Sequence, residues 1–103
     1  MIESLVENLK FIKNLIMHYF VYILLSNKDN NLYVGCSHDV LGRIVEHNSG
    51  KVLATKNRRP LAVIHTEEFQ DKAKAFNRER YLKSLWSARF KKKILNEYKQ
   101  SSA

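Results

Sequence analysis

The spacing of apolar residues in the first third of the chain predicts a helix followed by a hairpin of two strands. From residue 2 to residue 16 apolar side chains recur at steps of three and four, the period of an amphipathic helix. Residues 18–26 are rich in β-branched and aromatic side chains, and after the polar run 27–31 a second such segment covers residues 32–36. We expect these two segments to pair as antiparallel strands.

The rest of the chain predicts a third strand between helices. Asp39 is placed to cap a helix over residues 40–48, and Gly50 follows where a left-handed residue is favoured. After a basic loop at residues 51–60, the apolar run within residues 61–69 indicates a strand. Asp71 is placed to cap a helix that runs to about Trp86, and Ser87 to cap a last basic helix over residues 88–98.

This order of elements predicts an α/β (α+β) fold, with a small mixed or antiparallel sheet covered by helices. A chain of 103 residues has room for one modest core, so we expect a helical extension at 1–17, one domain at 18–98 and a tail at 99–103. The extension is expected to be a packing or dimerisation helix, which makes the protein a monomer or a weak dimer.

The lone cysteine, Cys36, excludes an internal disulfide and a zinc site built on cysteines, and it fits a reducing compartment. Residues 1–17 contain Glu3 and Glu7 and lack a basic leader before a continuous apolar run, unlike a secretion signal. No apolar stretch reaches the roughly 20 residues that span a bilayer. We therefore expect a cytoplasmic protein without a membrane partner.

The formal charge of +8 favours a polyanionic partner, because phosphates neutralised by lysine and arginine release condensed counterions. Nucleic acid is the first candidate and an anionic membrane the second. The basic residues fall into two clusters, each of which could also be an ordinary solvated face. The first comprises Lys51, Lys56, Arg58 and Arg59, and the second Lys83, Arg89, Lys91, Lys92, Lys93 and Lys99.

The acidic residue Glu79 is the most informative position for chemistry. On a helical wheel it shares a face with Ala75, Leu82 and Trp86, and a carboxylate among core residues needs a partner. That partner is either an arginine in a buried ion pair, with Arg43 or Arg78, or a hard cation such as Mg²⁺ held with waters and a substrate phosphate.

Further candidates lie on the predicted hairpin and on the helix that follows it. Arg43 and His47 are four residues apart on one side of that helix, where they could hold a phosphate or merely line the surface. Tyr22 and Tyr33 would lie opposite or diagonal on one face of the hairpin, where a hydroxyl could activate water or simply pack. Gly35, inside a strand, marks a close approach of backbone or ligand.

In order and spacing, these segments resemble the GIY-YIG nuclease superfamily, and most closely its small stand-alone bacterial branch. The resemblance runs from about residue 19 to residue 95. Phe20 stands where the first motif of the family usually has glycine. The segments are Val21-Tyr22-Ile23, Tyr33-Val34-Gly35, Arg43 with His47, His47-Asn48-Ser49-Gly50-Lys51, Arg58-Arg59-Pro60, Glu67-Glu68-Phe69 and Arg78-Glu79.

The resemblance implies a three-stranded antiparallel sheet flanked by helices and a metal-dependent endonuclease that hydrolyses DNA. Tyr22 and Tyr33 would be the motif tyrosines, one of which activates water, while Arg43 steadies the phosphate and His47 assists. Glu79 would hold Mg²⁺ or Mn²⁺. Lys51, Lys56, Arg58, Arg59, Lys91 and Lys92 would bind the nucleic-acid backbone, with RNA as an alternative to DNA and DNA repair or recombination as the setting.

Two other functions fit the same residues. A nucleic-acid-binding module could keep the fold and the basic surface while cutting weakly or not at all. A protein-interaction domain could act through the helix at residues 2–16. Loss of cleavage in Glu79→Ala with binding retained would support the nuclease.

Overall fold

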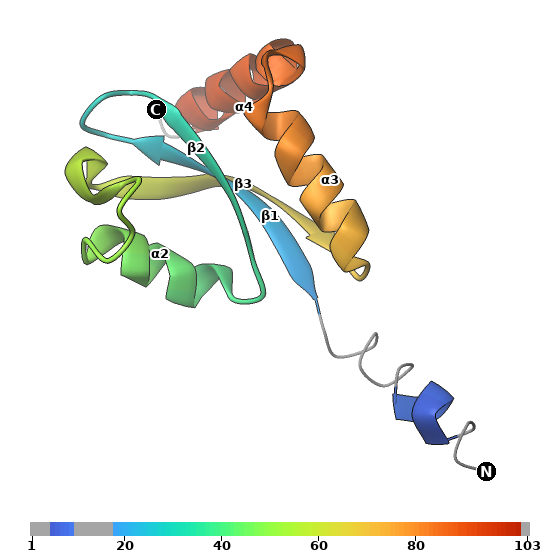
Figure 1. Cartoon of the computed structure of the whole chain (residues 1–103). Helices are drawn as coiled ribbons and strands as arrows, with labels where there is room; N and C mark the ends of the chain where they lie inside the picture. The colour runs from blue at the N-terminus through green and yellow to red at the C-terminus, as the bar shows by residue number, and fades with distance from the viewer. Residues whose placement is uncertain (1–4, 10–17, 102–103) are drawn as a thin grey trace.

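A three-stranded antiparallel sheet forms the centre of the computed structural model, which describes residues 5–9 and 18–101 (Figure 1). Strand β1 (Tyr19–Ser26) lies between β2 (Leu32–Ser37) and β3 (Leu61–Phe69), so the strand order is β2-β1-β3. The predicted hairpin and third strand are confirmed. β1 begins one residue later, and β2 ends one residue later, than the composition of the strands suggested.

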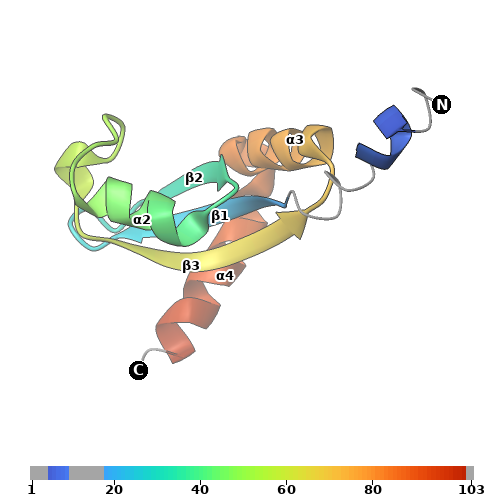
Figure 2. The same ribbon diagram turned by 90° about the horizontal axis from the view of Figure 1, so that it is seen from below.

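Helices cover both faces of the sheet. Helix α2 (Val40–Asn48) lies on one face, and α3 (Lys72–Lys83) lies on the other, against β1 and β2 (Figure 2). Helix α4 (Ala88–Ser101) contacts β3 on the α3 side and ends three residues later than predicted. Two short 3₁₀ turns complete the chain, η1 (Lys56–Arg58) before β3 and η2 (Leu85–Ser87) between α3 and α4.

The predicted helix starts are confirmed by their capping bonds. The Asp39 carboxylate accepts a hydrogen bond from the Gly42 amide at 3.0 Å. The Asp71 carboxylate accepts from two amides of the first turn of α3, at 2.8 and 3.3 Å. Gly50, just past α2, has a φ of 82°, as a left-handed residue should. Local polar chemistry therefore fixes where both helices begin.

Helix α3 ends at Lys83, so its predicted extension to Trp86 is wrong. Ser84 adopts an extended backbone, with ψ 162°, and its hydroxyl donates to the carbonyl three residues earlier at 2.6 Å. The expected capping role of Ser87 is also not what its side chain does. The Ser87 hydroxyl donates backwards to the carbonyls of Leu82 and Ser84, at 3.0 and 2.9 Å.

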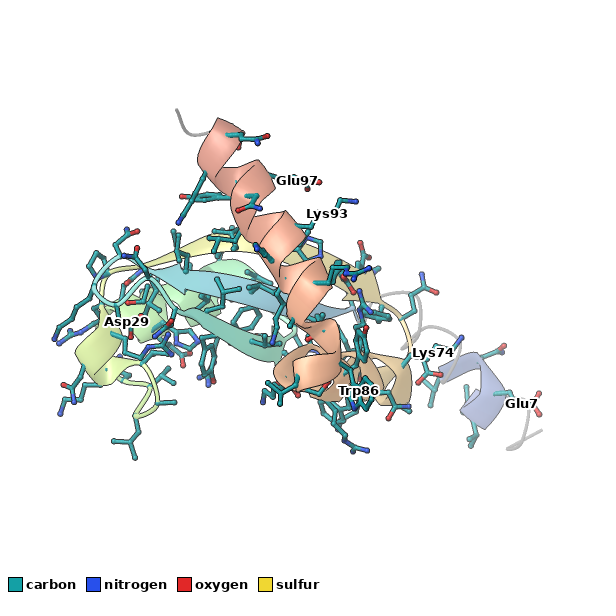
Figure 3. The ribbon with its side chains drawn as sticks, turned by 90° about the horizontal axis from the view of Figure 1, so that it is seen from above. Glu7, Asp29, Lys74, Trp86, Lys93 and Glu97 are labelled. Carbon is teal, nitrogen blue, oxygen red and sulfur yellow. The ribbon has the colours of Figure 1, made fainter. Side chains whose placement is uncertain are left out.

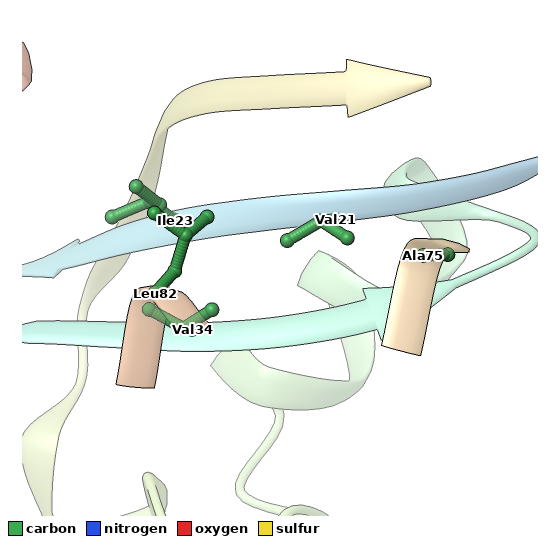
Figure 4. Packing of buried hydrophobic residues seen from close by; sticks show 5 residues of the cluster. All are labelled: Val21, Ile23, Val34, Ala75 and Leu82. Atoms are coloured by element: carbon green, nitrogen blue, oxygen red, sulfur yellow. The ribbon is translucent and has the colours of Figure 1, made fainter. Parts of the chain in front are cut away.

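The two faces of β1 supply two cores, because alternate residues of a strand point to opposite faces. The larger core lies under α3 and consists of Val21, Ile23, Val34, Ala75 and Leu82 (Figure 4). The smaller one lies under α2 and consists of Tyr22, Leu24 and Leu61, with Val40 and Ile44 packed against it. Leu41 and Val45, on the same helix, are 79% and 67% exposed.

Residues 5–9 form a helical turn in which Leu5, Val6 and Leu9 are exposed to solvent. The rest of the predicted helix at residues 2–16 lies outside the described residues, so its role in packing or dimerisation stays a prediction. Within residues 5–9 and 18–101, no helix is both long and apolar enough to cross a bilayer.

Candidate active site

A buried chain of hydrogen bonds links β1, α2 and the loop after α2. The Tyr22 hydroxyl lies 3.0 Å from His47 Nε2, and His47 Nδ1 lies 2.7 Å from the Thr55 hydroxyl. His47 and Thr55 have no exposed surface and Tyr22 is 2% exposed. His47 was expected either to hold a phosphate or to line the surface of its helix, and the structure places it in the core with both ring nitrogens bonded.

Burial sets the protonation states of Tyr22 and His47. It raises the pKa of Tyr22, and the neighbouring Arg43 only partly opposes the rise, so the phenol keeps its proton at neutral pH. Burial also lowers the pKa of His47, helped by the positive charge of Arg43, so the imidazole stays neutral. A neutral imidazole has one nitrogen free to accept a proton.

Tyr22 and Tyr33 are diagonal neighbours on the same face of the hairpin, as predicted. Tyr22 pairs with Gly35 and Tyr33 pairs with Leu24 in the β1–β2 register. The ring of Tyr33 lies 5.1 Å from the ring of His47, in an edge-on orientation. Because Tyr33 is partly exposed, it is the tyrosine that borders solvent.

Gly35 makes room for the Tyr22 ring. A Cβ atom at this position would lie 2.3 Å from the Tyr22 hydroxyl oxygen and 2.4 Å from the ring carbon that bears it. No side chain fits at such distances, so the predicted close approach at Gly35 is confirmed. The Tyr22 hydroxyl thereby lies over β2, an edge strand of the sheet.

Arg43 lies on α2, one helical turn before His47, and its side chain is beside Tyr22. Its guanidinium lies close enough to the Tyr22 hydroxyl to oppose the rise in its pKa. One nitrogen of the same group donates to the Glu46 carboxylate at 2.7 Å, and the side chain is 37% exposed. Arg43 thus joins the buried tyrosine to the surface, where a phosphate could reach its free donors.

Glu79 lies on α3, which packs against β1 and β2 on the face opposite α2. Burial is the main cause that raises the pKa of Cys36, and the charge of Glu79 raises it further. The same charge is a small cause of the raised pKa of Tyr22, so the Glu79 carboxylate lies within electrostatic range of both side chains. Tyr22, Tyr33, Arg43 and His47 therefore lie together on the α2 side of the sheet, and Glu79 lies on the α3 side.

The surroundings of Glu79 differ in two respects from those that the helical wheel predicted. Its side chain is 21% exposed and forms an ion pair with Lys83 at 3.4 Å, not with Arg43 or Arg78. Arg78 instead donates two hydrogen bonds to Glu67, at 2.7 and 3.0 Å. Trp86, expected on the same buried face, is 87% exposed. Since Lys83 is itself 53% exposed, the pairing leaves the carboxylate accessible.

The basic residues expected to bind nucleic acid are placed differently from one another. Lys51, Lys56 and Arg59 are exposed on the loop after α2, whereas Arg58 donates to Asp29 at 2.7 Å. That contact holds the pKa of the Asp29 carboxyl at about 2. On α4, Lys92 is exposed and Lys91 is partly buried. Lys91 lines a hollow of about 240 Å³ together with Leu32, Tyr33, Val34, Leu82 and Lys83.

Thr55 and Lys83 contribute to the site, yet sequence reasoning did not select them. Thr55 sits eight residues after His47 in an irregular loop, and no periodicity relates the two positions. Lys83 was assigned to a basic cluster only, although its spacing of four from Glu79 on a helix could have predicted the ion pair. Among the described residues, no cluster of three or more His, Cys, Asp or Glu side chains could hold a metal ion.

Comparisons with known proteins show the family of this chain. Residues 18–94 match the model of the GIY-YIG catalytic domain. The UPF0213 protein SH2523 of Staphylococcus haemolyticus is 40% identical over 80 residues, which cover 77% of this chain and 95% of that protein. The UPF0213 protein YazA of Bacillus subtilis is 38% identical over 86 residues, or 82% of this chain and 84% of its own.

A solved structure is also similar. The solution NMR structure of the UPF0213 protein BH0048 from Bacillus halodurans shares 37% sequence identity with this chain. The alignment covers 78% of this chain and 84% of that one, with a TM-score of 0.48.

Proposed function

The chain belongs to the GIY-YIG family of nuclease domains, and on that premise we propose that it is a divalent-metal-dependent endonuclease that hydrolyses phosphodiester bonds in DNA. The observation that supports the proposal is the grouping of two tyrosines, an arginine and a neutral histidine on one face of the sheet, with the Glu79 carboxylate on the other side within electrostatic range of Tyr22. These groups come from separate elements: the tyrosines from β1 and β2, the arginine and histidine from α2, and the carboxylate from α3 on the other face of the sheet. The periodicity of a single helix or strand therefore does not explain the grouping.

The residues present fit a hard divalent cation. Mg²⁺ and Mn²⁺ prefer oxygen ligands, and Mg²⁺ is commonly held by one or two carboxylates together with waters and substrate phosphates. Glu79 offers one such carboxylate, and its side chain is 21% exposed. Glu79 would therefore hold the ion, which when bound polarises the phosphate and offsets the charge of the transition state.

The chain's own residues would position the phosphate and move the proton. Arg43 would bind non-bridging phosphate oxygens through its planar fork of donors. Tyr33, at the solvent side, would orient the attacking water. Tyr22 would take a proton from that water while passing its own to His47 Nε2, with His47 Nδ1–H donating to Thr55. The leaving oxygen would take its proton from solvent.

Two basic regions would hold the DNA backbone. The loop after α2 contributes Lys51, Lys56 and Arg59, and α4 contributes Lys91 and Lys92. Arg58 is left out because Asp29 already occupies its guanidinium. These contacts would fix the position of the backbone without reading its sequence, so selection would rest on DNA structure, as at the branched intermediates of repair and recombination.

The test compares the full chain with Glu79→Gln on branched, flapped and single-stranded DNA, with Mg²⁺ or Mn²⁺. We expect the wild type to cut at least one of these DNAs, and the substitution to lower the rate about a hundredfold or more without loss of binding. Glu97→Gln is the matched control, because Glu97 is 58% exposed and pairs with Lys93 on α4.

Two results would reject the proposal. If wild type and Glu79→Gln bind DNA equally and neither cuts, the chain is a binding module of this fold. If Glu79→Gln cuts as fast as the wild type, the carboxylate does not hold the cation. The same assay with RNA strands decides whether cleavage is confined to DNA.

A further inference from the structure

Two large apolar side chains project into solvent at the corner between α3 and α4. Leu85 is 92% exposed and Trp86 is 87% exposed, and Figure 3 shows Trp86 at this corner. Tryptophan is highly buried on average, and an exposed apolar patch with a polar rim commonly marks a binding surface. The corner has no role in the site described above.

The backbone that carries Trp86 is held in place. The Ser87 side chain is fully buried, and its hydroxyl donates to the carbonyls of Leu82 and Ser84. The Tyr81 hydroxyl donates to the Trp86 carbonyl at 3.4 Å. An aromatic ring mounted on an ordered turn loses little conformational freedom when a partner binds. The exposure of Trp86 is thus a fixed feature of the corner.

The charge around the corner favours a polyanion. From Arg80 to Asn96 the chain has no acidic residue, and six basic residues fall in this interval. Lys83 and Lys91 line the hollow that also contains Tyr33, and the Lys91 ammonium donates to the Ser84 carbonyl at 3.4 Å. A second copy of the chain would bring like charges together, because each copy carries +8. A nucleic-acid strand fits this surface, because its bases can stack on the exposed indole and its phosphates can pair with the basic side chains.

We propose that Trp86 stacks on an unpaired base of the DNA substrate, while Lys83 and Lys91 bind the backbone that leads from it to the cleavage site. Glu79 precedes Trp86 by seven residues, which span at most about 25 Å of fully extended chain at about 3.6 Å per residue. A stacked strand advances about 3.4 Å per nucleotide, so the base would lie within about seven nucleotides of the scissile phosphate. This inference rests on the proposed function and adds its substrate class.

The base must be unpaired because stacking needs a free ring face. Inside a duplex both faces of each base are covered by its neighbours, so an indole can reach only a splayed or single-stranded base without paying for unstacking. The substrate class is therefore DNA that carries single-stranded nucleotides beside the cleavage site. The selectivity would come from Trp86, and not from the proposed catalytic residues.

Intrinsic fluorescence provides a direct test, because Trp86 is the single tryptophan of the chain. Glu79→Gln protein, without added metal, is titrated with a blunt hairpin duplex and with the same duplex carrying a single-stranded thymidine extension. Anisotropy of labelled DNA shows when each is bound. We expect the extended DNA to quench tryptophan emission at saturation and the blunt duplex to leave it nearly unchanged.

Substitution provides the second arm. Trp86→Ala should weaken binding of the extended DNA about tenfold, with little effect on the blunt duplex, and Trp86→Phe should recover most of the affinity. Leu41→Ala is the matched control, since Leu41 is an exposed apolar residue on the opposite side of the sheet. Circular dichroism confirms that each variant is folded.

Several outcomes would overturn the inference. Emission that does not respond to bound extended DNA would do so, as would an equal loss of affinity for both DNAs in Trp86→Ala. A dimer in sedimentation that Trp86→Ala dissociates, without any response to DNA, would assign the corner to a second copy. Failure of the nuclease proposal is a distinct result. If extended DNA quenches the emission but the wild type shows no metal-dependent cleavage, the enzymatic activity is rejected and the role of Trp86 in binding is kept.

Discussion

At the scale of single residues, Gly35 controls the position of the most buried catalytic candidate. Its missing side chain lets the Tyr22 hydroxyl lie over β2, within reach of His47 Nε2 at 3.0 Å. Both partners of that bond lack freedom to move, because Tyr22 is 2% exposed and His47 is fully buried. The alignment of the proposed proton path therefore depends on one absent methyl group.

Gly35→Ala should impair cleavage more than it impairs folding. The new methyl would push the Tyr22 ring away, at an expected cost of about 1–3 kcal/mol in the free energy of unfolding for overpacking. Urea unfolding measures that cost, and single-turnover cleavage measures the catalytic loss. Gly42→Ala is the comparison, because a methyl there would displace the Asp39 carboxylate that caps α2 and should cost stability without touching Tyr22. Full activity in Gly35→Ala would contradict the role assigned to Tyr22.

Residue chemistry could be predicted from the sequence only where spacing or a motif carried it. Tyr22, Tyr33, Arg43 and His47 follow from positions along two strands and one helix. Thr55 does not, because its contact with His47 depends on how an irregular loop folds back over α2. The ion pair of Arg43 with Glu46 was likewise missed, although a spacing of three on a helix allows it.

At the scale of elements, a charged network fastens α3 and α4 to β3. Arg78 on α3 donates two hydrogen bonds to Glu67 on β3, and its guanidinium lies 4.9 Å from the centre of the Phe90 ring on α4. His65 Nε2 lies 2.8 Å from Glu67 Oε2, the oxygen that also accepts one of the bonds from Arg78. The positions of Glu79 and Trp86 both depend on where α3 lies. This network therefore helps to position both residues.

Glu67→Gln should lower the free energy of unfolding by about 1–2 kcal/mol at pH 7, because it removes a partly buried charge-assisted pair. The bonds from Arg78 are the main cause that lowers the pKa of Glu67 below its usual 4.5. The folded state therefore holds the ionised form more tightly than the unfolded state. The stability from this pair is present above pH 4.5 and is lost as the pH falls below it.

The difference between wild type and Glu67→Gln should accordingly shrink in acid. Denaturant titrations between pH 7 and about pH 3 measure this, with Glu68→Gln as the control because Glu68 is 53% exposed. An unchanged difference across that range would mean that the Arg78 pair contributes no pH-dependent stability.

Elements with strong local signals were predictable, and the α3–α4 corner was not. The bounds of α2 and β3 follow from caps and apolar runs. The end of α3 was misjudged because Leu82, Leu85 and Trp86 keep an approximately helical spacing while the backbone at Ser84 turns extended. Periodicity reports apolar positions, but it does not say that the two beyond Ser84 face solvent.

At the scale of the whole molecule, the excess of positive charge is divided between two regions on different elements. One is the loop after α2, where Lys56 and Arg59 border an open pocket of about 430 Å³ with Lys28. The other is the α3–α4 side, where Lys83 and Lys91 line the hollow beside Tyr33. DNA that contacts both regions would span the loop after α2 and the α3–α4 side.

Removing charge from the loop should weaken DNA binding without regard to sequence. Lys56→Ala and Arg59→Ala should each lower the slope of log affinity against log salt concentration by about one. Arg58→Ala is the matched control, because its guanidinium is engaged by Asp29, and it should lower the midpoint of thermal unfolding instead. Anisotropy over a range of salt concentrations measures the slopes. Equal slopes in all three variants and the wild type would exclude the loop as a backbone contact.

The ion pair with Glu46 gives the Arg43 guanidinium an anionic partner from the same helix. At 2.7 Å, the Glu46 carboxylate takes one of the donors that a phosphodiester would need. An incoming DNA strand would have to displace the Glu46 carboxylate from Arg43. A small anion such as free phosphate would meet the same competition with far fewer additional contacts. A small anion at Arg43 would therefore bind weakly, whereas a longer nucleic-acid ligand would offset the lost pair through contacts with other basic residues.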